Sequence, residues 1–143
     1  MADMHHLVQI DGVGAAAAYA ALTTTDGITG WWTSRATGSG VTVGDRLSMS
    51  FPDAPVTWDM TVAVADRPIR VEWDCTGGPP GWPGTRVVWA IEPIAAGVVV
   101  RFDHTRFDTV DDMFRIVTVG WAQMLLSLRE HLASGVRKPF FDF

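Results

Sequence analysis

His104 is the residue whose surroundings most favour a chemical role. Alternate positions in this part of the sequence hold Val98, Val100, Phe102, His104 and Arg106. Alternate residues of a β-strand point to the same face of a sheet, so His104 is expected among apolar neighbours. A neutral imidazole there could donate to a ligand carbonyl or accept from a ligand hydroxyl. The alternative is a core histidine whose ring nitrogens are satisfied by the protein itself.

Charged residues give His104 no obvious acid–base partner. Asp59 or Arg86 would have to turn inward to meet it, and the alternation of their strands places both on the outer face. Arg35 could meet a ligand carboxylate at a cavity mouth, or it could remain a solvated charge.

Nucleophilic catalysis has even less support. The chain has no Gly-x-Ser-x-Gly motif, and Ser48, Ser50 and Ser127 have no histidine at a motif distance. Cys75 is the only cysteine, and no histidine or basic residue adjoins it in sequence. We therefore expect a small buried hydrophobe rather than a reactive thiol.

No metal and no cofactor are expected. His5, His6 and His131 are too scattered to converge on one ion, which typically needs three or four protein ligands. Gly38-Ser39-Gly40 lacks the lysine and the helix of a phosphate-binding loop.

Seven tryptophans stand against one tyrosine in 143 residues. Tryptophan buries a large area and carries a single donor, so several on one sheet face leave irregular space with aromatic walls. This pattern favours a pocket, although each tryptophan could equally be core. The residues expected to line the pocket are Trp31, Trp32, Met49, Trp58, Met60, Trp73, Trp89, Phe102, His104, Phe114, Val117 and Trp121.

The composition limits domain count and partners. A chain of 143 residues suits a single domain, 1–143, with a substantial core. With 11 basic and 16 acidic residues the net charge is −5, which argues against a nucleic-acid partner. No signal or membrane-spanning segment is evident, and the single cysteine cannot form an internal disulfide. We therefore expect a cytoplasmic protein without membrane insertion.

One long helix and a run of strands would position these residues. Apolar residues recur every three or four positions from Phe114 to Leu132, which predicts an amphipathic helix over Val110–Ser134. The segment 42–107 alternates as short strands separated by turns. A first strand over His6–Ile10 and helices over Val13–Leu22 and Asp26–Trp32 precede it. On a helix, only one of the neighbours Trp31 and Trp32 could face inward.

Two segments outside the regular elements carry aromatic residues. The Gly- and Pro-rich stretch 77–84 is predicted to be a surface loop that carries Trp82 and could serve as an entrance flap. The C-terminal segment holds Phe140, Phe141 and Phe143, which should pack back on the body or on a second chain. A homodimer through these phenylalanines or Trp82 is one possibility.

The order of elements and five short stretches carry a family resemblance. The stretches are Ile28–Thr33 (ITGWWT), Val41–Arg46 (VTVGDR), Val87–Ile91 (VVWAI), Phe102–Thr105 (FDHT) and Gly120–Leu128. Together they resemble the bacterial family related to the activator of Hsp90 ATPase, in the START-like (Bet v 1-like, SRPBCC) superfamily. The resemblance implies an α+β helix-grip fold. A curved antiparallel sheet of about six or seven strands would wrap around the long helix, with two short helices after the first strand.

Three functions are compatible with the sequence. The resemblance implies a cavity that holds lipids, hormones, polyketides or other apolar molecules, and the tryptophan-rich face agrees with it. We therefore expect binding of a small apolar or aromatic ligand between the C-terminal helix and the sheet, rather than an enzyme. The alternatives are a cyclase/aromatase-like or hydrolytic activity using His104, and a protein-interaction module of a co-chaperone-like kind.

Overall fold

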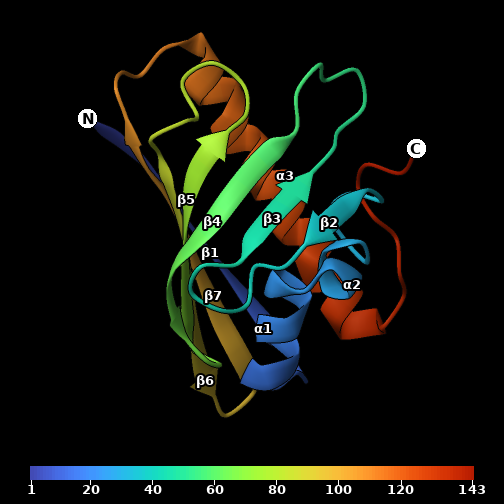
Figure 1. The fold of residues 1–143 in the computed structure, drawn as a ribbon. Coiled ribbons are helices and arrows are strands. Elements are labelled where there is room, and N and C mark those ends of the chain that lie inside the picture. Colours follow the sequence, from blue (N-terminus) through green and yellow to red (C-terminus); the bar gives the residue numbers. More distant parts are fainter.

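Ten helices and strands make up the fold, and the computed structural model describes all of residues 1–143 (Figure 1). In chain order they are β1 (Ala2–Asp11), α1 (Ala15–Thr23), α2 (Thr25–Ile28), β2 (Ala36–Gly38), β3 (Arg46–Met49), β4 (Trp58–Asp66), β5 (Arg70–Gly77), β6 (Arg86–Ile94), β7 (Gly97–Phe107) and α3 (Asp112–Ser134).

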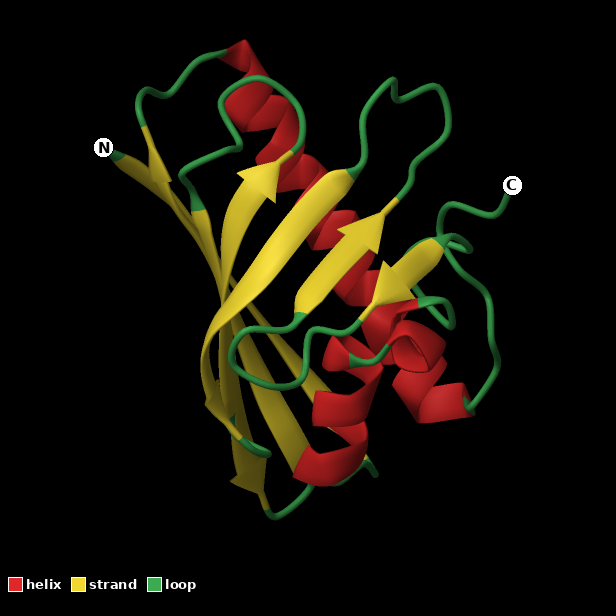
Figure 2. Cartoon of the chain, in the orientation of Figure 1, coloured by secondary structure: helices red, strands yellow, loops and turns green.

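The seven strands form one antiparallel sheet in the order β1-β7-β6-β5-β4-β3-β2. From β2 to β6, each strand pairs with the strand that follows it in the sequence. The first strand closes the other edge by pairing with β7, where Val8 lies opposite Val100. Figure 2 shows the curved sheet with the helices on its inner side. The predicted α+β helix-grip fold is therefore confirmed.

The long helix α3 has the features that its sequence predicts. Its N-terminus is capped by Asp111, whose carboxylate accepts from the backbone N–H of Phe114 at 2.8 Å. It ends at Gly135, which adopts the left-handed conformation at φ 73°. Trp121, Leu125 and Leu128 are buried on its inner face. No helix of the structure combines the length and apolar character required to cross a bilayer.

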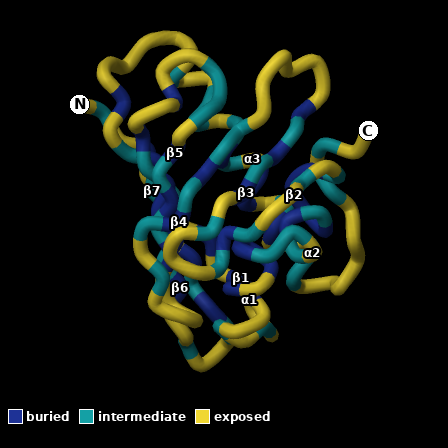
Figure 3. The backbone as a smooth tube through the Cα atoms, in the orientation of Figure 1, coloured by how far each residue is buried: buried dark blue, intermediate teal, exposed yellow.

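A single hydrophobic core lies between the helices and the sheet. Figure 3 shows buried backbone concentrated there and exposed backbone in the loops at both ends. Trp31, Trp73, Trp89 and Phe102 are fully buried in this core. Aromatic side chains thus form a large part of this core.

The alternation of buried residues breaks at three strand ends, one of which corrects the inward position expected for Arg106. Val64 is exposed because a register shift between Val62 and Val64 interrupts the alternation of β4. Ile69 is exposed because it lies in the turn before β5. Arg106 has φ 72° and points outward, so Phe107 is buried in its place.

Trp31 and Trp32 are both buried, which corrects the expectation that only one faces inward. They do not lie on a helix, because α2 ends at Ile28. In the turn that follows, the two rings stack with centroids 5.3 Å apart. The Trp31 indole N–H also donates to the carbonyl of Ala21 at 2.8 Å.

The C-terminal tail, residues 136–143, packs back on the body of the same chain. The backbone N–H groups of Phe140 and Phe141 donate to the carbonyls of Trp31 and Trp32, at 3.0 and 2.9 Å. Ser34 N–H donates in return to the Phe141 carbonyl at 2.8 Å. The tail therefore follows the segment after α2 as a short parallel strand-like contact.

Candidate ligand-binding site

An apolar pocket of about 160 Å³ opens at the margin of the core, between α3, the tail and the loop after β5. Its walls are hydrophobic apart from one glycine and one glutamine. The lining residues are Trp32, Trp58, Trp82, Ile116, Val117, Gly120, Trp121, Gln123, Met124, Phe140 and Phe141. No charged side chain is among them.

Helix α3 forms one wall through residues spaced three and four apart. Val117, Trp121 and Met124 lie on its inner side, and Gly120 lies beside them. A Cβ placed on Gly120 would meet no atom within 4 Å. The glycine therefore leaves open volume where any other residue would place a side chain.

The tail supplies a second wall through Phe140 and Phe141. The Phe141 ring contacts Phe51 edge to face, with centroids 5.2 Å apart. Phe140 is about half exposed and lies at the rim. Because the tail is held by backbone hydrogen bonds to Trp31 and Trp32, its position is tied to that of the tryptophan pair.

The loop after β5 lies at the surface, with Pro80, Gly81, Pro83 and Gly84 exposed, but its tryptophan turns inward. Trp82 is only 1% exposed, which corrects the prediction of a surface tryptophan and removes it as a contact for a partner. Its ring lies 4.2 Å from that of Trp58 and 4.7 Å from that of His104, between centroids. Burial of this large ring anchors the Gly- and Pro-rich loop to the core.

His104 joins this loop to α3 by a directional chain of hydrogen bonds. The Trp121 indole N–H donates to His104 Nδ1 at 3.1 Å, so Nδ1 is the unprotonated nitrogen. The proton is then on Nε2, which donates to Thr85 Oγ1 at 2.8 Å. The Thr85 hydroxyl donates in turn to the Trp82 carbonyl at 2.6 Å. Every member of the chain is satisfied.

This geometry makes His104 a structural residue. It is fully buried, and burial lowers its pKa to about 3, so the ring stays neutral. Both ring nitrogens are committed to protein partners, and His104 does not line the pocket. Cys75 lies 3.9 Å away, and burial raises the pKa of its thiol to about 11. Neither group has the access or the charge state of a catalyst.

Three buried indole N–H groups have no hydrogen-bond partner: those of Trp32, Trp58 and Trp89. Buried donors are normally paired, so an unpaired one requires an explanation. Trp32 and Trp58 line the pocket, whereas Trp89 does not. Two tryptophans of the pocket wall therefore contain unsatisfied donors, but these nitrogen atoms are themselves covered by protein atoms.

A comparison with protein families finds one family model that matches most of the chain. Residues 13–133 match the model of the family described as Activator of Hsp90 ATPase homolog 1-like protein. This chain belongs to that family. A search of curated protein sequences gives no match.

Solved structures agree with this assignment. The solution structure of the Aha1 dimer from Colwellia psychrerythraea is 31% identical, with a TM-score of 0.85 over 94% of this chain and 98% of that one. SSP2350 from Staphylococcus saprophyticus is 20% identical, with a TM-score of 0.79 over 99% and 98%. DynU16, from the dynemicin biosynthetic locus, is 16% identical, with a TM-score of 0.81 over 99% of this chain and 51% of its own. The last two show likeness of fold alone.

Four residues expected from the sequence to bind a ligand line the pocket of this family member: Trp32, Trp58, Val117 and Trp121. Six others belong to the filled core and lie outside the pocket: Trp31, Met49, Met60, Trp73, Trp89 and Phe102. Phe114 packs against Phe107, with ring centroids 5.3 Å apart, also outside the pocket. His104 touches the pocket only through the rings of Trp82 and Trp121.

Gly120 and Met124 line the pocket although the sequence patterns did not identify them as ligand-binding residues. Gly120 carried a readable signal, since a glycine inside a helix costs about 1 kcal/mol relative to alanine and requires a local reason. Met124 carried none beyond its position on the apolar stripe. Of the charged residues, Arg35 is occupied by the tail, with its guanidinium 4.3 Å from the centre of the Phe143 ring.

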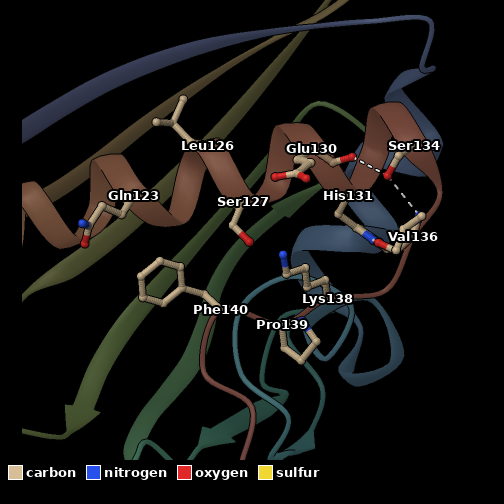
Figure 4. Close-up of a pocket in the computed structure, with 10 residues that line it drawn as sticks. All are labelled: Gln123, Leu126, Ser127, Glu130, His131, Ser134, Val136, Lys138, Pro139 and Phe140. Carbon is tan, nitrogen blue, oxygen red and sulfur yellow. Dashed lines mark hydrogen bonds between the residues drawn. The ribbon is translucent and has the colours of Figure 1, made fainter.

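A larger and more polar groove lies between the C-terminal half of α3 and the tail (Figure 4). Its volume is about 470 Å³, and its walls include Glu130, His131 and Lys138. His131 Nδ1 lies 2.8 Å from the Val136 carbonyl, and Ser134 bridges Glu130 to Val136. The His131 ring and the Ser134 hydroxyl are thus paired with backbone groups at the end of the helix, and only three of the ten lining residues are hydrophobic. No group of three or more His, Cys, Asp or Glu side chains is arranged to hold a metal ion.

Proposed function

We propose that this protein binds a small apolar or aromatic molecule in the pocket between α3, the tail and the Trp82 loop. The observation that carries the proposal is the wall itself, which is almost entirely hydrophobic and includes four tryptophans. Concave sites with apolar, aromatic walls and few polar groups are typical of small-molecule binding. The volume of about 160 Å³ suits one aromatic ring with small substituents, since a cavity of about 150 Å³ holds benzene.

Substitution of Gly120 tests this proposal without unfolding the protein. Gly120→Leu should place a side chain in the pocket, and it replaces glycine by a better helix former. We expect Gly120→Leu to abolish binding of toluene, measured by ligand-observed NMR, while the free energy of unfolding stays equal or rises.

Gly120→Ala is the matched control. It adds only one carbon atom, so it should retain toluene binding and raise stability by about 0.5–1 kcal/mol. Toluene binding that survives Gly120→Leu unchanged would show that the ligand, if any, is held elsewhere.

Self-association is a second proposed property, supported by an apolar surface on α3. Ile116 and Val119 are 64% and 60% exposed on the outer side of the helix, with Met113 and Leu126 also exposed. Phe140 of the tail continues this surface. Exposed apolar patches of this kind mark interaction sites. The 31% identical relative from Colwellia psychrerythraea is a dimer, and we propose a second copy of this chain as the occupant.

A charged residue at the centre of this surface should separate the copies. Val119→Glu leaves the pocket intact because Val119 does not line it. We expect light scattering to give a dimer mass for the unmodified protein and a monomer mass for Val119→Glu. Val43→Glu, at an equally exposed site in a loop, should remain dimeric. A monomer mass for the unmodified protein at high concentration would reject the proposal.

A further inference from the structure

The apolar pocket has a buried floor and an exposed rim. Trp82, Trp121 and Met124 form part of its floor and are buried. At the rim, Ile116 and Phe140 are 64% and 46% exposed. The pocket is therefore open to solvent on this side, and a ring that lies on the floor would keep part of its surface in water.

An open rim limits the apolar surface that a ligand can bury here. Small-molecule sites typically bury about 70–90% of the surface of the ligand. Apolar surface that stays in water adds nothing to binding, because its removal from water is what stabilises the complex. A cover over Ile116 and Phe140 would complete the site.

The rim is also part of the apolar surface that we propose for self-association. Ile116 and Val119 are three positions apart, so they share one side of α3. Val119 lies outside the pocket, but it is followed by Gly120, which lines it. Phe140 reaches α3 from the tail (Figure 4). A molecule that contacts Val119 and Ile116 would therefore extend over the mouth of the pocket.

The second copy of this chain, proposed above from the dimeric relative, is the cover that we infer. In a two-fold dimer the same surface of each copy meets the other. Each copy would therefore place its exposed apolar side chains over the pocket of its partner. The dimer would hold two equivalent closed sites in place of two open ones.

We propose that the second copy completes the ligand pocket, so that dimer formation and ligand binding strengthen each other. This inference rests on the proposed function and adds its regulation by self-association. A coupling free energy between two binding events is reciprocal, so a dimer that binds the ligand more tightly must itself be stabilised by the ligand. The affinity for the ligand should fall when the copies separate.

Toluene binding to a monomeric variant tests the first direction of this coupling. Val119→Glu removes the second copy without altering the pocket wall, and toluene carries no charge that the new carboxylate could attract or repel. We expect Val119→Glu to bind toluene at least about fivefold more weakly than the unmodified protein, the lower end of typical coupling between sites. Val43→Glu, which should remain dimeric, should bind toluene with unchanged affinity. Titrations followed by ligand-observed NMR measure both.

The reverse direction requires no substitution. Saturating toluene should lower the dimer dissociation constant of the unmodified protein by the square of that factor, about 25-fold or more, because each dimer closes two sites. Light scattering over a dilution series, with and without toluene, measures this change. Gly120→Leu, whose side chain should fill the pocket, is the control: toluene should leave its dimer dissociation constant unchanged.

Three results would overturn the inference, and they can be told apart. Equal toluene affinity of the dimer and of Val119→Glu, with a dimer dissociation constant that toluene leaves unchanged, would show that one copy holds the whole site. Toluene binding by an unmodified protein that stays monomeric at all concentrations would show the same. Both results leave the proposed ligand binding standing. Absence of toluene binding by every one of these proteins would overturn the proposed function as well.

Discussion

At the scale of single residues, the relay from Trp121 through His104 and Thr85 to Trp82 determines how the loop after β5 sits. Each donor in it has one acceptor, and all of its groups are buried or backbone. Buried polar networks are stabilising when complete and costly when one member is lost. The relay therefore fixes Trp82 and Trp121, two walls of the pocket, relative to each other.

Thr85→Val should break the relay at its centre with little change of shape. The buried His104 Nε2–H would lose its acceptor, and the Trp82 carbonyl would keep only the backbone N–H of Thr85, which should lower the free energy of unfolding by about 1–3 kcal/mol. Chemical denaturation measures this. The control is Thr105→Val, whose hydroxyl makes only a 3.3 Å contact to the Arg86 carbonyl and should change stability by at most about 0.5 kcal/mol. Equal effects of the two substitutions would contradict the role given to Thr85.

The neutral state of His104 predicts a loss of stability in acid. Burial lowers its pKa from about 6.5 to about 3, so between these values the unfolded chain binds a proton that the folded chain does not. The free energy of unfolding should therefore fall as the pH drops below about 6.5, by up to about 1.4 kcal/mol per pH unit, and level off near pH 3.

His104→Leu isolates this contribution. The pKa of His6 is also lowered by burial, so some acid sensitivity should persist in the variant. We expect the slope of stability against pH between 4 and 6 to be smaller in His104→Leu by up to one proton. Identical slopes would mean that His104 is not buried in its neutral form.

The sequence located His104 on an inward face, but it contained no indication of the partners. Alternation along one strand is a local pattern, and it identified Val98, Val100 and Phe102 as buried neighbours. Thr85 and Trp121 lie 19 and 17 residues away in the chain. Their meeting depends on how the loop and α3 pack, which no local pattern contains.

At the scale of elements, α3 and the tail form two walls of the apolar pocket. The helix was predictable because its stripe, its capping aspartate and its terminal glycine all agree. The inward position of Trp82 in the 77–84 loop was not, because Gly and Pro indicate a turn without indicating where its side chains point. The tail was expected to pack on the body or on a second chain, and the structure shows the first.

Removal of residues 139–143 should weaken both the fold and the pocket. A chain that ends at Lys138 loses the backbone bonds to Trp31, Trp32 and Ser34, together with Phe140 and Phe141. We expect a loss of roughly 2–4 kcal/mol of stability and a loss of toluene binding. A chain that ends at Asp142 keeps both phenylalanines and should retain the pocket. Full toluene binding by the shorter chain would show that the tail is not a wall.

At the scale of the whole molecule, the helix-grip architecture leaves its free volume at the edge of the core. The elements in the right order made the fold recognisable, and Trp31, Trp73, Trp89 and Phe102 are buried in the core between the helices and the sheet. Which tryptophans fill the core and which line a pocket depends on how the rings pack together, so composition and alternation could not separate them. At the margin of this core, where Gly120 omits a side chain, an apolar pocket stays open.

The position of a bound ring tests the proposed pocket most directly. Intermolecular nuclear Overhauser effects should be recorded between toluene and the methyl groups of the protein. We predict contacts to the methyls of Val117 and Met124, which line the apolar pocket. Contacts to Leu126 and Val136 instead, in the polar groove along the end of α3, would contradict it.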